Sequence, residues 1–186
     1  VLNIGKFPRN GAFLICPNHL SYIDPLLIYG LLPNSLVKRL MFIAFGEIFE
    51  RPPLAWLTRV ARIILTGGAD TLTESLKLSA EGLWQGMAVC IFPEGARSND
   101  GELQTPRPGA GILSIETKSP IVPILIVGAE QTLSPRQPKL RPCRIQMFVG
   151  DPIIPPSLES PTLKDYQAIV DCWQEAILKL RAQVSS

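Results

Sequence analysis

The sequence predicts an α/β protein in which helices flank a mixed, mostly parallel sheet as a single layered domain. Two observations carry this prediction. Short apolar runs recur along the 186 residues, and stretches with helical spacing of apolar residues separate them. A chain of this length can bury one sizeable hydrophobic core, whereas a second independent core would be cramped. We therefore expect residues 1–186 to form one domain.

The expected strands are short apolar runs bounded by glycine, proline or asparagine. The clearest is "AFLIC", between the pair Asn10-Gly11 and Pro17. Three later runs have the same character, and "IVPILIV" among them carries a proline. The four expected strands cover residues 12–16, 87–92, 121–127 and 145–149.

The expected helices show apolar residues at spacings of three and four. The last is the most clearly amphipathic, with one apolar face that should cover the sheet, formed by Tyr166, Ile169, Val170, Trp173, Ile177 and Leu180. Asp24 and Pro25 suit the start of the first helix, because an acid and a proline are both favoured in a first turn. The expected helices cover residues 24–32, 71–84, 109–117 and 162–184.

The segment "LAWLTRVARIIL", residues 54–65, allows two interpretations. It is apolar nearly all round, which is typical of a core helix followed by a strand. Alternatively, a helix here dips into a lipid interface, with Arg59 and Arg62 turned toward headgroups. In the second case Trp56 would be part of the membrane contact.

Composition excludes several classes of protein. A net charge of +2 is too small for the basic face of a typical nucleic-acid binder, so we expect no nucleic acid as partner. The mean hydropathy of +0.21 fits either a lipid-facing surface or a large buried sheet. No apolar run reaches the roughly 18 residues that span a bilayer. The chain begins at Val1 in strand-like sequence, so we expect a further segment upstream.

The cysteines do not predict a disulfide framework or a zinc site. They are widely spaced and form no C-x-x-C pair, which favours buried free thiols in a reducing compartment. The four are Cys16, Cys90, Cys143 and Cys172.

Two unusual loops, "NHLSYID" and "PEGARS", each follow an expected strand. Ligands of open α/β sheets gather beyond the carboxyl ends of the strands, so both loops should open on one crevice. His19 is the only histidine of the chain, and Asp24 follows it by five residues. A histidine removes a proton from an alcohol near neutral pH, and a carboxylate can fix its tautomer. Alone, however, a histidine at a strand end is more often structural.

The second loop combines a tight turn with two charged groups. Pro93 and Gly95 impose the turn, Glu94 offers a carboxylate to hydroxyls, and Arg97 offers a planar fork to a phosphate. Alone, it would be read as a turn with a surface ion pair. The chain lacks the G-x-S-x-G elbow of serine hydrolases and the several histidines or clustered cysteines of zinc enzymes. The simplest remaining chemistry is direct attack by a substrate hydroxyl.

Together, these loops resemble two blocks of the glycerolipid acyltransferase family, which includes 1-acylglycerol-3-phosphate acyltransferases. The family's blocks are N-H-x-x-x-x-D and F-P-E-G-T-R-S. "PIVPI", around Pro123, and "GDPI", at residues 150–153, resemble later blocks of the family. The matching residues of the first two blocks are Asn18, His19 and Asp24, then Phe92, Pro93, Glu94, Gly95, Arg97 and Ser98, with Ala96 in place of threonine.

The resemblance implies a glycerol-3-phosphate acyltransferase-like fold, whose motif-bearing core spans residues 10–154, and transfer of a fatty acyl group. The donor is acyl-CoA or acyl carrier protein, the acceptor is the free hydroxyl of lysophosphatidic acid, and the product is phosphatidic acid. His19 is the implied general base and Asp24 orients it. No metal or other cofactor is implied, and the expected location is peripheral, on the cytoplasmic face of a membrane. The implied substrate-binding residues are Asn18, Glu94, Gly95, Arg97, Ser98 and Arg107.

One block departs from the family pattern and leaves the acceptor open. Thr66 stands where the family usually has an arginine at the end of a strand. Arg62 is a candidate substitute and Arg107 is a second candidate for the phosphate, whereas Lys38 and Arg39 fit solvated surface charges better. The alternatives are another acceptor, such as glycerol-3-phosphate or a different lysolipid, an acyl thioesterase, and a non-catalytic lipid or acyl-carrier binding module.

Overall fold

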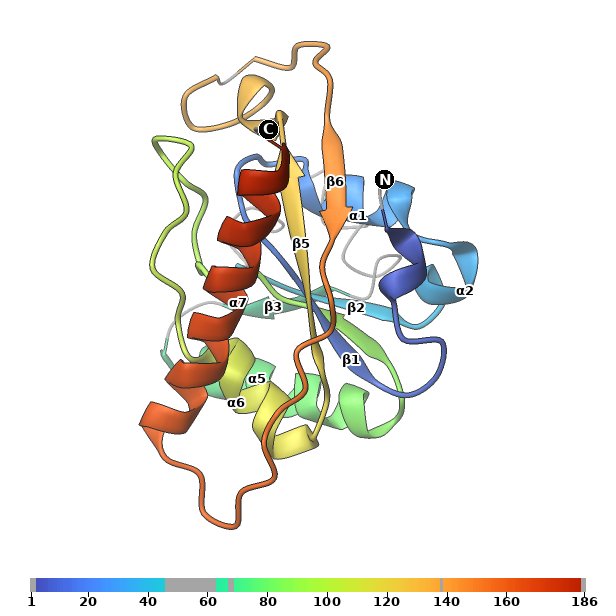
Figure 1. Ribbon diagram of the computed structural model, residues 1–186, viewed down its shortest axis with the longest axis vertical. Helices are drawn as coiled ribbons and strands as arrows, with labels where there is room; N and C mark the ends of the chain where they lie inside the picture. Colours follow the sequence, from blue (N-terminus) through green and yellow to red (C-terminus); the bar gives the residue numbers. More distant parts are fainter. Residues whose placement is uncertain (1–2, 46–62, 67–68, 138, 185–186) are drawn as a thin grey trace.

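A computed structural model describes residues 3–45, 63–66, 69–137 and 139–184 (Figure 1). Its centre is a six-stranded sheet with strand order β3-β2-β4-β1-β5-β6. The first five strands of that order run parallel, and β6 is antiparallel to β5. The strands are β1 (Phe13–Pro17), β2 (Leu40–Phe45), β3 (Ile63–Thr66), β4 (Ala88–Cys90), β5 (Ile121–Val127) and β6 (Gln146–Val149).

Helices lie on both faces of the sheet. The α-helices are α1 (Asp24–Leu31), α2 (Asn34–Val37), α5 (Ala69–Trp84), α6 (Gly109–Thr117) and α7 (Leu163–Val184). Two short 3-10 helices complete the described elements, η1 (Ile4–Lys6) and η2 (Ala129–Gln131). The α/β class and the mostly parallel sheet predicted from the sequence are therefore confirmed.

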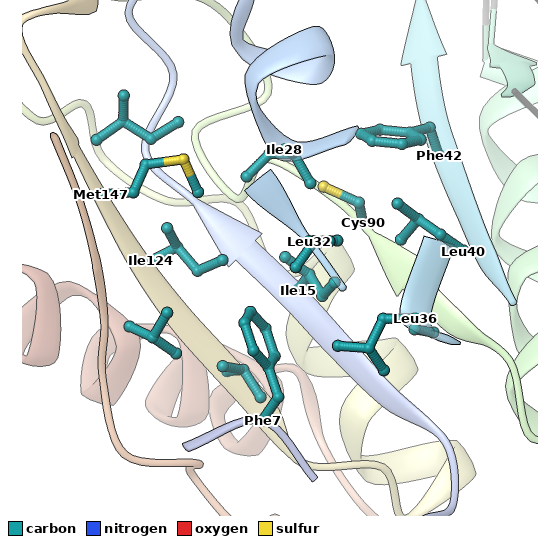
Figure 2. Packing of buried hydrophobic residues seen from close by; sticks show 14 of the residues in the cluster. Phe7, Ile15, Ile28, Leu32, Leu36, Leu40, Phe42, Cys90, Ile124 and Met147 are labelled. Carbon is teal, nitrogen blue, oxygen red and sulfur yellow. The ribbon is translucent and has the colours of Figure 1, made fainter. Parts of the chain in front are cut away.

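The sheet separates two hydrophobic cores. Alternate residues of β1 enter each of them: Phe13 and Ile15 pack with α1 and α2 (Figure 2), while Leu14 and Cys16 pack with α6 and α7. A strand buried on both faces reads as a continuous apolar run, which is why "FLIC" shows no polar alternation. The large buried sheet accounts for the high hydropathy of the chain.

The helix α7 covers the sheet with the face predicted from its sequence. Ile169, Val170, Trp173, Ile177 and Leu180 are buried along it. The indole N–H of Trp173 donates a hydrogen bond of 2.7 Å to the backbone carbonyl of Cys16. This contact fixes the end of β1, two residues before Asn18.

Differences from the sequence-based predictions are local. Strand β2 and helix α2 were not predicted, and α5 begins two residues earlier than expected. Of the ambiguous segment 54–65, residues 63–65 lie in β3; Trp56, Arg59 and Arg62 fall outside the described residues. Within the described ranges, none of the helices has the length and apolar character needed to span a bilayer.

Candidate active site

The loop after β1 is folded around one carboxylate oxygen. Asp24 Oδ2 accepts hydrogen bonds from the backbone N–H groups of Leu20 and Ser21, at 2.7 and 2.8 Å. The same oxygen lies 2.8 Å from Nδ1 of His19. The tight loop that the sequence suggested therefore does bring His19 and Asp24 together.

Asp24 is inaccessible to solvent and occupies the first turn of α1. Because Asp24 Oδ2 already accepts two backbone N–H groups, it is an acceptor toward His19 as well. Nδ1 of His19 is then the donating ring nitrogen, which leaves Nε2 as a proton acceptor. No hydrogen bond to Nε2 is seen among the described residues. The pair thus has the arrangement of a general base and its orienting acid.

The second loop makes three contacts with His19. The imidazole stacks on Phe92, with ring centroids 4.0 Å apart and an interplanar angle of 21°. The backbone N–H of His19 donates to Glu94 Oε1 at 2.7 Å, and its carbonyl accepts from the N–H of Ser98 at 2.9 Å. Both polar backbone groups of His19 are therefore bound by the "FPEGARS" loop.

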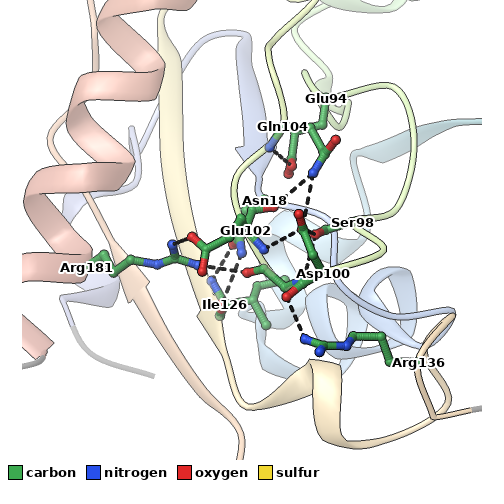
Figure 3. A network of polar contacts seen from close by, with 10 residues as sticks. Asn18, Glu94, Ser98, Asp100, Glu102, Gln104, Ile126, Arg136 and Arg181 are labelled. Carbon is green, nitrogen blue, oxygen red and sulfur yellow. Dashed lines mark hydrogen bonds and ion pairs between the residues drawn. The ribbon is translucent and has the colours of Figure 1, made fainter.

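Glu94 is buried, and both its oxygens bind backbone amides. Oε1 is bonded to His19, and Oε2 accepts from the N–H of Gln104 at 2.7 Å (Figure 3). Burial raises the pKa of Glu94 to about 7, although the two amide donors act in the opposite direction. The carboxylate is positioned to hold His19, with each of its oxygens bound to one backbone amide.

Arg97 lies beside the first loop and forms no ion pair within the described ranges. Its guanidinium carbon is 3.9 Å from the centroid of the Tyr22 ring, in a cation–π contact. Its Nε is buried and has no hydrogen-bond partner among the described residues. A guanidinium stacked on one face keeps its N–H edges available for an anion.

Gly95 and Arg107 fit against each other. Gly95 has φ +70°, and a Cβ built on it would lie 3.0 Å from Cδ of Arg107. The backbone N–H of Arg107 donates to the carbonyl of Pro93 at 2.8 Å. Arg107 is exposed, and its side chain crosses the turn that precedes Arg97. Arg107 therefore packs on the same short turn that carries Arg97.

Asn18 and Ser98, both expected to bind substrate, make internal hydrogen bonds. The Asn18 amide donates to the carbonyl of Ile126 at 3.1 Å and accepts from its N–H at 2.6 Å. This pair extends the pairing of β1 with β5 beyond the end of the strand. Ser98 Oγ donates to Asp100 and accepts from the N–H of Gly101. We assign both side chains a positioning role in place of the expected substrate contact.

The segment after Ser98 is tied down at two points (Figure 3). Arg181 of α7 forms an ion pair of 2.7 Å with Glu102. On the other side, Arg136 donates to the backbone carbonyl of Asp100 at 2.6 Å. These contacts hold the segment that presents the Gln104 amide to Glu94.

The remaining basic candidates differ in their positions. Arg39 donates to the carbonyls of Gly11 and Gly86, so it is a structural residue and not the solvated charge expected. Thr66 ends the edge strand β3, three strands away from β1 in the sheet. At a strand spacing of about 4.8 Å, this places its backbone roughly 14 Å from that of β1.

The cysteines only partly follow the prediction. All four are free, and Cys16 and Cys90 are buried as expected. Cys143 is partly accessible and Cys172 is exposed, because it lies on the outer side of α7. Burial raises the pKa of Cys90, which therefore stays a neutral thiol.

Sequence reasoning missed Tyr22 and Gln104 as parts of this site. Tyr22 stacks on Arg97, and Gln104 contributes only its backbone N–H. The position of Tyr22 inside the "NHLSYID" block was the available signal. A backbone donor leaves no signal in the residue type.

Comparison with known proteins agrees with this geometry. The Acyltransferase family model matches residues 1–127. The chain belongs to the Acyltransferase family. The match contains both loops of the site, and it ends at the last residue of β5.

Individual relatives are similar over most of this chain. It is 26% identical to the 1-acyl-sn-glycerol-3-phosphate acyltransferase alpha of Mus musculus, covering 97% of the chain and 62% of the relative. It is 29% identical to the 1-acyl-sn-glycerol-3-phosphate acyltransferase of Cocos nucifera, covering 89% and 53%. The chain thus spans between half and two thirds of the length of these acyltransferase relatives.

A solved structure shows the same fold. The 1-acyl-sn-glycerophosphate acyltransferase PlsC of Thermotoga maritima matches with a TM-score of 0.75 and 22% identity. The match covers 97% of this chain and 70% of that protein. The layered sheet and its helices are therefore those of an acyltransferase of known structure.

Proposed function

We propose that this acyltransferase moves a fatty acyl group from a thioester, acyl-CoA or acyl carrier protein, to the free hydroxyl of 1-acylglycerol-3-phosphate. The observation that carries the proposal is the contact of 2.8 Å between His19 Nδ1 and Asp24 Oδ2, which leaves Nε2 to act on the substrate. The names of the relatives support the choice of lysophosphatidic acid as acceptor. By this function the protein works at a membrane surface, with its site on the cytoplasmic face.

The mechanism needs no covalent intermediate. Nε2 of His19 takes the proton of the acceptor hydroxyl while the oxygen attacks the thioester carbonyl. The C–S bond then breaks, and the leaving thiolate receives the proton from the imidazolium. Asp24 stabilises that imidazolium, and Glu94 keeps the backbone of His19 in place. General base catalysis of this kind contributes a factor of about 10² to 10⁴.

Arg97 and Arg107 are the groups we assign to the acceptor phosphate. Neither side chain forms an ion pair with an acid in the described part of the chain; Arg97 stacks on Tyr22, and Arg107 packs on the Gly95 turn. A planar guanidinium binds phosphate oxygens with paired hydrogen bonds. Since Thr66 lies at the far edge of the sheet, these two arginines carry the phosphate contact in this proposal.

The direct test is acyl transfer from a radiolabelled thioester to lysophosphatidic acid in detergent micelles, with thiol release followed in parallel. Both acyl-CoA and acyl carrier protein are supplied as donors. The His19→Ala variant should lose at least a factor of about 10², and Lys164→Ala, on the surface of α7, is the matched control. Thiol release without lipid product would identify a hydrolase or a different acceptor. Full activity of His19→Ala would exclude His19 as the base.

The phosphate assignment has its own test. Arg97→Gln should raise the KM for lysophosphatidic acid and leave the KM for monoacylglycerol, which lacks the phosphate, nearly unchanged. Loss of one charged hydrogen bond to phosphate corresponds to about 1.5 to 3 kcal/mol, or roughly 10- to 100-fold. An equal change for both acceptors would show that Arg97 supports the loop and does not bind the phosphate.

A further inference from the structure

A basic loop lies between η2 and β6. We use this name for residues 134–137 and 139–144, which carry Arg136, Lys139, Arg141 and Arg144. All four side chains are exposed, and the sequence has no acidic residue between Glu130 and Asp151. Leu140 stands among them and is 72% exposed. Cations around an exposed leucine are typical of a surface that meets lipid headgroups.

The basic loop adjoins the candidate active site. The carbonyl of Leu133, just before it, accepts from Oγ of Ser21 at 2.9 Å and from the N–H of Tyr22 at 3.0 Å. Inside the loop, Arg136 reaches the carbonyl of Asp100. In Figure 1 the loop lies at the top of the view, beyond the arrowhead of β5. It is therefore attached to both loops that surround His19.

Much of the positive charge of the basic loop is not neutralised within the protein. Arg136 has Asp100 nearby; the backbone N–H of Glu102 and the hydroxyl of Ser98 lower the pKa of that carboxyl most, and Arg136 adds a smaller effect in the same direction. Lys139 and Arg144 have no anionic partner in the part of the chain that the structure describes. Tyr22, 44% exposed, adds an amphipathic ring at the same end of the molecule. The combination of free cations with exposed apolar groups favours an anionic lipid surface over a purely ionic partner.

We propose that the basic loop docks the protein on an anionic lipid surface. Lys139 and Arg144 contact headgroup phosphates, Leu140 enters the boundary of the acyl chains, and the His19 site faces the bilayer. The lipid nature of the partner rests on the proposed function, because a lysolipid acceptor resides in that surface. Binding itself requires no catalysis and is measured separately.

The test is co-sedimentation of the whole chain with phosphatidylcholine vesicles, with and without phosphatidylglycerol. The variant Lys139→Gln/Arg144→Gln removes two cations, and Lys77→Gln/Lys164→Gln removes two exposed cations from α5 and α7 as the matched control. Each cation near an anionic surface contributes about fivefold in binding, so the loop variant should bind about 25-fold more weakly at low salt. The control should bind as the wild type does, and Leu140→Ser should weaken binding at high salt as well.

Several outcomes would overturn the proposal. The first is that the wild type shows no preference for anionic vesicles, and the second is that the loop variant and the control lose vesicle binding equally. The third is that the loop variant keeps its vesicle binding and loses only acyl transfer from acyl carrier protein. The last would identify an acidic protein as the partner. Far-ultraviolet circular dichroism checks that all variants are folded. If the expected binding pattern holds while the wild type transfers no acyl group, docking stands and only the proposed function fails.

Discussion

At the residue scale, Glu94 differs most from the role that its motif suggested. Its carboxylate binds two backbone amides that are ten and 75 positions away in sequence, those of Gln104 and His19. In the proposed mechanism it acts through the position of His19. A displacement of about 1 Å at a catalytic group can lower a rate about 10²-fold.

We expect Glu94→Gln to lower kcat by about 10- to 100-fold and to leave the KM for both substrates nearly unchanged. The side-chain amide of the introduced glutamine has one oxygen and one NH₂ group. One of the two backbone N–H groups that Glu94 binds would therefore face another donor. Glu81→Gln is the matched control, because Glu81 is an exposed glutamate of α5 outside both loops of the site. A rise in the KM for the acceptor with unchanged kcat would instead make Glu94 a substrate-binding residue.

Gly95 is a second residue whose role follows from its geometry. Its φ of +70° disfavours any side chain, and a Cβ would press on Arg107. Gly86 has a similar φ of +80°, with nothing within 4 Å of its added Cβ. The two glycines therefore share the positive φ angle, and only at Gly95 would an added Cβ contact Arg107.

We expect Gly95→Ala and Gly86→Ala to lose similar stability, about 1 to 2 kcal/mol each, measured by urea unfolding. Only Gly95→Ala should also raise the KM for lysophosphatidic acid, because Arg107 has to move. An unchanged KM in Gly95→Ala would mean that Arg107 does not contact the acceptor.

At the element scale, α7 sets the end of the strand that leads into the site. The Trp173 N–H satisfies the carbonyl of Cys16, and the indole is fully buried. Trp173→Phe keeps most of the apolar contact and removes this donor. We expect a loss of about 1 kcal/mol in the free energy of unfolding, since one buried hydrogen bond is lost while the Cys16 carbonyl keeps its place in the pairing of β1 with β5.

Trp84→Phe provides the control for that substitution, because Trp84 is 67% exposed at the end of α5. Its change in the free energy of unfolding should stay within about 0.5 kcal/mol. Equal effects of the two substitutions would show that the hydrogen bond to Cys16 contributes nothing measurable.

Elements with a clear apolar pattern and clearly marked ends were predictable from the sequence, whereas an apolar strand with an unmarked start was not. The helix α7 was predicted almost to its ends, because its buried residues recur every three or four positions. The strand β2 was missed because "LMFIAF" directly follows the basic pair Lys38-Arg39, with no glycine, proline or asparagine to mark its start. Turn residues that mark the ends of an element were thus as important for predicting it as its hydrophobicity.

The candidate site was predictable as a set of residues but not as a set of roles. The spacing of His19 and Asp24 indicated their contact, since a tight loop can join positions five apart. The partners of Glu94 and Asn18 are backbone groups of distant segments, those of Gln104, His19 and Ile126. Such partners depend on the strand order, which residue types alone do not encode.

At the scale of the whole molecule, the strand order explains how the two loops meet. β1 and β4 are parallel neighbours, so the loops that follow them emerge side by side at the carboxyl-terminal end of the strands. His19 follows β1 and Glu94 follows β4. The buried carboxylate of Glu94 joins the two loops there, through its hydrogen bond to the backbone of His19.

This buried carboxylate links the stability of the whole molecule to pH. The pKa of Glu94 rises from 4.5 to about 7 in the folded protein because of burial. Between these values the folded state holds a proton that the unfolded state has lost, so the free energy of unfolding falls as pH rises. The shift corresponds to about 3 kcal/mol over that interval, with no further loss from this group above pH 7 to 8.

Comparison with Glu94→Gln isolates this contribution, because all other groups titrate in both proteins. We expect the free energy of unfolding of the wild type, minus that of the variant, to decrease from pH 4.5 to pH 7. Urea unfolding at intervals of half a pH unit measures it. A difference that increases with pH would mean that the two backbone amides outweigh burial and keep Glu94 ionised. In that case Glu94 would stay ionised throughout this range and would hold the backbone of His19 equally well at each pH.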